Sequence, residues 1–336
     1  MLDWLSALVY FEILSVGLVL WVLIYLARKL DSRSTQLLFV AYALILAPLS
    51  TGLSVANVSI PAVTLCLLAV LLAADGRELL AGAMLAISIC LKPTTGLPGL
   101  VYLLFVRRWR VCGYALALST MITGAALMRM HYLPARWQVD YRANLNYLFG
   151  PTGAASYSSA SDGRFDLLNL QVPVFALTQS HPAAEIIPWV LVLILGGWWL
   201  AMIRTYPALA PRLESAAVVL LLGLLPVYQR SYNAGFVLLA LLWAFMNLED
   251  RVAKAILIVG FVFVIPGEAL IRTALHGHSF SSGRLWNGVV MPQESWALVA
   301  LVVIQLGAIW RTSRQGCVSR SVKGRDTGSR HEALRT

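Results

Sequence analysis

The chain has 336 residues, of which 59% are hydrophobic and only 12% charged, and its mean hydropathy is +0.75. A soluble protein of this length cannot bury that much apolar surface, and the apolar residues occur in long runs. Composition therefore excludes an ordinary soluble enzyme and predicts an all-α, polytopic membrane protein. The net charge of +10 does not indicate nucleic-acid binding, because much of it lies in the polar stretch 311–336. We expect that stretch to be a basic, disordered cytoplasmic tail near anionic membrane lipids.

About eleven apolar runs are suited to cross or enter a membrane. They lie at about 4–27, 36–50, 57–74, 79–91, 97–106, 111–128, 187–203, 214–228, 234–248, 253–271 and 295–310. If the side that holds Arg28, Lys29 and Arg33 is cytoplasmic, strict alternation places most Lys and Arg residues inside, as the positive-inside rule requires. We therefore expect residues 1–310 to form one transmembrane domain of a bacterial inner membrane, with a cytoplasmic C-terminus and a large extracytoplasmic loop over about 129–186.

A lysine followed by a proline interrupts the apolar pattern at Lys92-Pro93. The run 79–91 would span only ~20 Å as a helix and the run 97–106 only about 15 Å, against a hydrocarbon core of roughly 30 Å. The two runs therefore predict a short helical hairpin with a lysine at its break. An ionisable residue at membrane depth usually faces a protein interior or a wet cavity and marks a site.

The predicted outer loop carries groups that bind polar ligands, among them Arg164, Asn169 and Gln171, with aromatic residues between them. Flat rings beside amide and carboxylate groups suit a sugar, whose faces are apolar and whose edges carry hydroxyls. The alternative is an ordinary interfacial loop, in which Trp and Tyr anchor the protein at the membrane surface.

A second polar cluster separates the runs 214–228 and 234–248 and contains Tyr228, Gln229, Arg230, Tyr232 and Asn233. By alternation, its arginine lies on the same side as the lysine of the hairpin. A lysine, which is a point charge, and an arginine, which binds in a bidentate way, would together suit the phosphate of a lipid carrier at that depth. The alternative for the arginine is a snorkelling interfacial side chain.

Several stretches resemble glycosyltransferase family 87. The residues DGRELLAGAMLAISICLKPTTGLPGLVYLLFVRRWR resemble the signature of that family, in which a short helix ends in Lys-Pro and a second short segment closes with a basic turn. LSVANVSIPAVTL resembles the preceding segment, PVYQRSYNA resembles a Tyr-x-Arg-x-Tyr-Asp hinge, and FDLLNLQVPVF is a softer match.

The resemblance implies a GT-C type membrane fold and an enzyme that transfers a hexose, often mannose, from a polyprenyl-phosphate donor to a lipid or glycan acceptor on the extracytoplasmic face. It implies that Lys92 lies near the donor phosphate and that Arg230 is a second contact. Asn57 falls at the polar amide that commonly follows a glycine in the family, but Ala56 replaces that glycine here. Asn233 stands where the family hinge has Asp.

Enzymes of this type are thought to use an aspartate of the first outer loop as the general base. The first segment of this chain resembles a later helix of the family, so we expect the N-terminal part that carries the aspartate to be absent. The catalytic residue is then unknown, and Asp166 and Asp140 are candidates by loop position alone.

The sequence predicts no metal site and no cofactor. His276 and His278 form a lone HxH, and the cysteines show no CxxC spacing. Two alternatives to an enzyme remain open, a lipid-linked sugar transporter or flippase and a non-catalytic glycan-binding remnant. Transporters also build sites at broken helices, often with an inverted repeat, but the hairpin has no repeat in the second half of the sequence.

Overall fold

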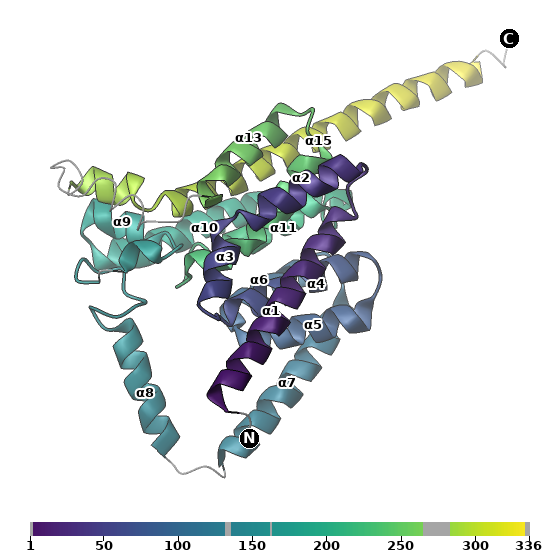
Figure 1. The fold of residues 1–336 in the computed structure, drawn as a ribbon. Coiled ribbons are helices and arrows are strands. Elements are labelled where there is room, and N and C mark those ends of the chain that lie inside the picture. The colour runs from purple at the N-terminus through teal and green to yellow at the C-terminus, as the bar shows by residue number, and fades with distance from the viewer. Residues whose placement is uncertain (1–2, 132–135, 162, 265–282, 333–336) are drawn as a thin grey trace.

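The computed structural model describes residues 3–131, 136–161, 163–264 and 283–332, with side chains as far as Arg314. The described residues form helices and turns without a strand, which confirms the all-α prediction (Figure 1). The α-helices are α1 (Trp4–Ala27), α2 (Arg33–Leu44), α3 (Ala47–Ser54), α4 (Ser59–Ala74), α5 (Glu78–Leu91), α6 (Pro93–Phe105), α7 (Trp109–His131), α8 (Arg136–Phe149), α9 (Gln171–Thr178), α10 (His181–Thr205), α11 (Leu213–Leu222), α12 (Val237–Met246), α13 (Arg251–Gly260) and α15 (Gln293–Glu332).

Four of the described helices are long and apolar enough to cross a membrane, and they lie at Trp4–Ala27, Trp109–His131, His181–Thr205 and Gln293–Arg314. The run predicted at 36–50 is broken into α2 and α3, which meet at an angle of 53° and make a fifth span if counted together. Helices α4, α5 and α11 are apolar but shorter. A membrane protein is confirmed at this level, whereas the count of eleven segments stays a prediction.

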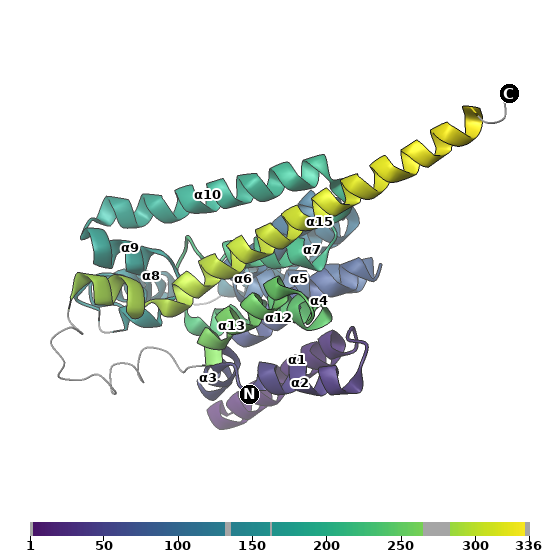
Figure 2. The same cartoon turned by 90° about the horizontal axis from the view of Figure 1, so that it is seen from above.

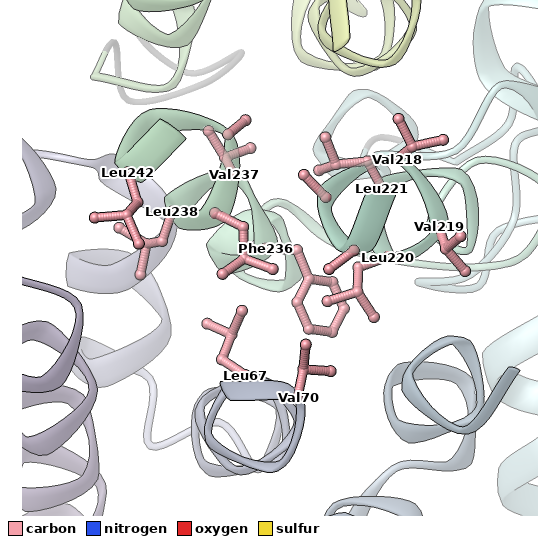
Figure 3. Close-up of a cluster of buried hydrophobic side chains, with 14 of the residues drawn as sticks. Leu67, Val70, Val218, Val219, Leu220, Leu221, Phe236, Val237, Leu238 and Leu242 are labelled. Atoms are coloured by element: carbon pink, nitrogen blue, oxygen red, sulfur yellow. The ribbon is translucent and has the colours of Figure 1, made fainter. Parts of the chain in front are cut away.

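The core lies between α4, α11 and α12. Nearly every residue of these three helices is buried, which is typical of a helix that is hydrophobic on all sides. Leu220 of α11 points toward Leu67 and Val70 of α4, and Phe236 lies beside it (Figure 3). The surrounding helices therefore pack on a dry central layer.

The outer helices frame this layer. Helix α10 lies along one edge of the molecule and α1 and α2 along the other, while α15 crosses the bundle and continues beyond it to Glu332 (Figure 2). The expectation of a disordered tail over 311–336 stays a prediction. The stretch 129–186, predicted as one outer loop, contains α8, α9 and a short 3-10 helix at Arg164–Asp166. Its position outside the membrane also stays a prediction.

The Lys-Pro pair forms a hairpin of two short helices. Helix α5 ends at Leu91, and Lys92 is extended, with φ −154° and ψ 96°, because a residue before proline avoids the helical region. Pro93 then starts α6, where a missing N–H costs nothing. The two helices touch at Gly96, where a β-carbon would lie 2.7 Å from the backbone nitrogen of Ile89. Helix α6 therefore packs closely against α5.

Basic residues gather at the end of the bundle opposite Lys92. There Lys29, which lies between α1 and α2, pairs at 3.2 Å with Asp75, which lies between α4 and α5. At the same end Arg311 pairs with Asp250 at 2.6 Å, and this hydrogen bond holds the pKa of the Asp250 carboxyl below its usual value. The hairpin and the basic end thus lie at opposite ends of α5 and α6. Which end faces the cytoplasm stays a prediction.

Candidate functional site

Lys92 reaches across the break of the hairpin to two neighbouring elements. Its Nζ donates to Ser59 Oγ at 2.8 Å and to Asn233 Oδ1 at 3.0 Å. Nζ also lies 5.6 Å from the ring centre of Tyr232. Ser59 begins α4, and Asn233 and Tyr232 belong to the 3-10 helix Ser231–Phe236 that leads into α12. The hairpin lysine and the hinge predicted from the sequence are therefore in contact.

Arg230 lies beside this group. Its Nε donates to the hydroxyl of Tyr228 at 3.2 Å and its Nη2 to the carbonyl of Ala154 at 3.2 Å. The charge of Arg230 is close enough to act on the ammonium of Lys92, and the carboxylate of Asp166 is close enough to act on Arg230. The structure thus brings together the two cations that we expected to share a side.

Both cations are held by neutral groups. Among the residues that the structure describes, no carboxylate forms an ion pair with Lys92 or Arg230. Two like charges that lie close together, half-buried and without a counter-ion, destabilise a protein unless an anion compensates them. This arrangement is suited to binding an anion.

The segments FDLLNLQVPVF and PVYQRSYNA, which resembled separate family motifs, lie side by side. The N–H of Leu168 donates to the carbonyl of Gln229 at 2.8 Å, and that of Leu170 to the carbonyl of Leu225 at 2.9 Å. Leu167 and Arg230 form an isolated antiparallel bridge. The backbone next to Asp166 is thereby fixed against the backbone that carries the arginine.

Three of the predicted substrate-binding amides are fully buried, at 0% exposure each: Asn169, Gln229 and Asn233. Their contacts are with the protein itself. Gln229 donates to the carbonyl of Thr94 at 3.3 Å, Asn169 donates to Gln171 Oε1 at 2.9 Å, and Asn233 donates to the carbonyl of Arg230 at 3.1 Å. In this structure they position the site, and a direct contact with substrate stays a prediction.

Asn57 has a similar positioning role. Its Oδ1 accepts from the N–H of Ser59 at 2.9 Å, at the start of α4. Before it, Ala56 adopts a left-handed conformation with φ 48°. The N–H groups of Ala56 and Asn57 bond to the carbonyls of Leu53 and Gly52 at 3.0 Å each, which is the Schellman ending of α3. Glycine suits such a position, so the departure noted at Ala56 has a conformational cost.

A cavity of about 690 Å³ is lined by apolar and polar groups, among them Tyr228, the residue that accepts a hydrogen bond from Arg230, and we call it the polar cavity. Its lining includes two of the predicted residues, Gln171 and Tyr228. The hydroxyl of Tyr157 donates to Glu185 Oε1 at 3.3 Å. Burial and, to a smaller extent, the charge of Glu185 raise the pKa of Tyr157, which keeps its hydroxyl protonated. The cavity thus offers a hydroxyl, a carboxylate and flat rings, the groups expected for a sugar.

An apolar groove of about 560 Å³ runs between α6, α10 and α11. Thr94, Trp189, Pro226 and Val227 line both the groove and the polar cavity, so the groove opens into it. Thr94 is two residues beyond Lys92. A long apolar chain in the groove would therefore end near the cations.

The other predicted site residues are more distant from this group. Arg164 lines a smaller cavity of about 250 Å³, and its Cζ lies 4.6 Å from the ring centre of Phe165. Asp140 is exposed on α8, which stands apart from the bundle in Figure 1, and makes no hydrogen bond or ion pair with a described residue. The structure does not bring Asp140 near the cations.

Sequence reasoning missed three groups of the site. His181, Glu185 and Trp189 line the polar cavity from the first turns of α10. Polar residues at the start of an apolar helix are common at membrane interfaces, so nothing in the sequence distinguishes these three.

The family comparison agrees with this arrangement. The sequence model of glycosyltransferase family 87 matches residues 1–227, which is more than half of the chain. The chain belongs to glycosyltransferase family 87. Searches of curated proteins and of solved structures gave no match. The match includes the hairpin and α10, while most of the hinge lies beyond it. Membership of family 87 makes the chain a membrane glycosyltransferase by family, with a sugar donor and an acceptor as its substrates.

Ala56→Gly is expected to stabilise the protein by up to about 1 kcal/mol, because glycine adopts the left-handed conformation without strain. The matched control is Ala125→Gly in the exposed part of α7, where glycine should destabilise the helix by about 1 kcal/mol. Thermal unfolding of both variants in detergent measures the effects. Equal destabilisation by both changes would contradict the role of the left-handed turn.

Proposed function

We propose that this family 87 protein transfers a hexose, mannose by resemblance to its family, from a polyprenyl-phosphate donor to a lipid or glycan acceptor. The observation that carries the proposal is the pair of cations, Lys92 and Arg230, which form no ion pair with a described carboxylate and lie beside the place where an apolar groove opens into a polar cavity. A lipid-linked sugar has the same three parts in the same order: an apolar chain, a phosphate and a polar ring.

Each of the three parts of the donor has a region of the protein that suits it. The isoprenoid chain lies in the groove of α6, α10 and α11, because nearly all of its lining is apolar. The phosphate lies near Lys92 and Arg230, where charge-assisted hydrogen bonds are strongest. The sugar occupies the polar cavity, where the rings of Tyr228 and Trp189 offer faces for stacking.

The reaction that fits this arrangement is a displacement at the anomeric carbon. The acceptor hydroxyl forms a bond to that carbon and gives its proton to a carboxylate, while the bond from the carbon to the phosphate oxygen breaks. Polyprenyl phosphate leaves with the electron pair. Lys92 and Arg230 stabilise the negative charge that develops on the leaving phosphate, which is where fixed cations contribute most to catalysis.

Two carboxylates near the site are candidates for the general base. Asp166 is close enough to Arg230 to interact with its charge, and it is exposed. Glu185 lies in the polar cavity but accepts a hydrogen bond from Tyr157. We propose Asp166 as the base, because it lies at the cation pair, where the phosphate bond breaks.

The position of the donor site also indicates on which side of the membrane the reaction takes place. The reaction takes place at the end of the bundle opposite the basic residues, which the positive-inside rule makes the extracytoplasmic side of a bacterial inner membrane. Transport of the lipid-linked sugar is less favoured, because the nearly apolar lining of the groove offers few hydrogen-bond partners to a sugar that moves along it.

Lys92→Met should weaken the binding of polyprenyl phosphate by about 10-fold or more, because a charge-assisted hydrogen bond contributes roughly 1.5–3 kcal/mol. Transfer should fall with it. Lys29→Met is the control, since it removes an equal charge at the opposite end. Binding is measured by competition with a fluorescent polyprenyl phosphate, and folding by size-exclusion chromatography. Unchanged affinity in a well-folded Lys92→Met would remove the phosphate-binding role.

Asp166→Asn should lower kcat by about 10²–10⁴-fold, the usual contribution of a general base, and should not weaken donor binding, because it removes a negative charge near the phosphate. Glu185→Gln and Asp140→Asn are near-isosteric controls that should keep most of the activity. The assay follows transfer from a radiolabelled polyprenyl-phosphate sugar. If Glu185→Gln is the inactive variant and Asp166→Asn is active, the base is Glu185 and the assignment of Asp166 is wrong.

A further inference from the structure

A second polar cavity lies at the opposite end of α6 from Lys92. It measures about 680 Å³ and lies between the C-terminal ends of α6 and α10 and the residues that precede α11. Its charged lining is Arg107, Arg108 and Arg204, and we call it the arginine cavity. Phe105 and Leu200 line both this cavity and the apolar groove, so apolar surface leads away from the arginines into the membrane region.

The backbone at Arg107 is in an unfavourable conformation for an arginine. Its φ is 60°, and its N–H donates to the carbonyl of Leu104 at 3.1 Å, while the N–H of Arg108 donates to the carbonyl of Leu103 at 2.9 Å. This is the Schellman ending in which glycine is usual, and α4 ends in the same way with Gly76 at φ 79°. A strained residue that lines a cavity indicates a function for its side chain.

The arginines of the cavity are not neutralised. Among the described residues, the side chains of Arg107, Arg108 and Arg204 form no hydrogen bond or ion pair. Their neighbours differ, since Arg110 pairs with Glu78 at 3.6 Å and Arg212 with Glu214 at 3.9 Å. Three guanidinium groups around one hollow match the oxygens of a phosphate, which they bind in a bidentate way.

We propose that the arginine cavity binds the phosphate headgroup of an anionic phospholipid from the leaflet at that end of the bundle. The acyl chains of this lipid lie against the apolar surface that begins at Phe105 and Leu200. Basic pockets between membrane helices bind such headgroups through the same combination of charge and adjoining apolar surface. The lipid joins the ends of α6 and α10 and so supports the groove between them.

The test compares lipid dependence in two charge-matched double variants. Wild-type protein, Arg107→Gly/Arg204→Gln and Arg28→Gln/Arg33→Gln are reconstituted in nanodiscs of phosphatidylcholine with or without phosphatidylglycerol. Thermal unfolding and native mass spectrometry report stability and retained lipid. The control variant loses the same two positive charges as the cavity variant, but Arg28 and Arg33 do not line the cavity. Inorganic phosphate in phosphatidylcholine nanodiscs serves as a free anion.

Phosphatidylglycerol should raise the Tm of wild type and of the control by several degrees and stay bound to both. The cavity variant should lose most of this rise and retain less lipid. In phosphatidylcholine alone, the single change Arg107→Gly should raise Tm, because it relieves the strained turn. An equal loss in both double variants would mean a general surface-charge effect, and an equal rise with inorganic phosphate would mean a free-anion site. Either result overturns the proposal.

Discussion

The structure depends on the break that Pro93 imposes after Lys92. A helix that continued through this point would have carried the lysine side chain along its surface, whereas the proline ends α5 and turns the chain back into α6. The break leaves an ammonium group between helices, and Ser59 and Asn233 hold it there. Gly96 allows α6 to lie against α5, and Thr94 in the first turn of α6 lines both the groove and the polar cavity.

Both ends of α6 combine positive charge with adjoining apolar surface, but in different ways. At one end the cations are held by neutral partners and adjoin a polar cavity, which suits a substrate whose phosphate is released in the reaction. At the other end three arginines line a cavity that has no carboxylate among its described lining residues, which suits a lipid that stays. The two sites are separated by the length of a 13-residue helix, roughly 20 Å. One apolar surface connects them.

Much of this architecture could be predicted from the sequence, because it follows from local chemistry. Hydrophobic runs gave α1 with the bounds expected, and the Lys-Pro pair gave the hairpin. Membrane alternation predicted that Lys92 and Arg230 share a side, whereas their closeness depends on how the hairpin and the hinge pack. The pairing of Leu168 with Gln229 could not be predicted, because it depends on how distant helices pack. Neither could the cavity role of Glu185, since a carboxylate in the first turns of an apolar helix looks like any interfacial residue.

The central claim is that a polyprenyl phosphate lies with its chain in the groove and its phosphate at Lys92. Photolabelling tests it most directly, with a polyprenyl phosphate that carries a diazirine in its first isoprene units, followed by peptide mapping. The account predicts labels on α6 and α10, removed by excess polyprenyl phosphate but not by the uncharged polyprenol. Labels on α1 or α7, or equal competition by the polyprenol, would contradict it.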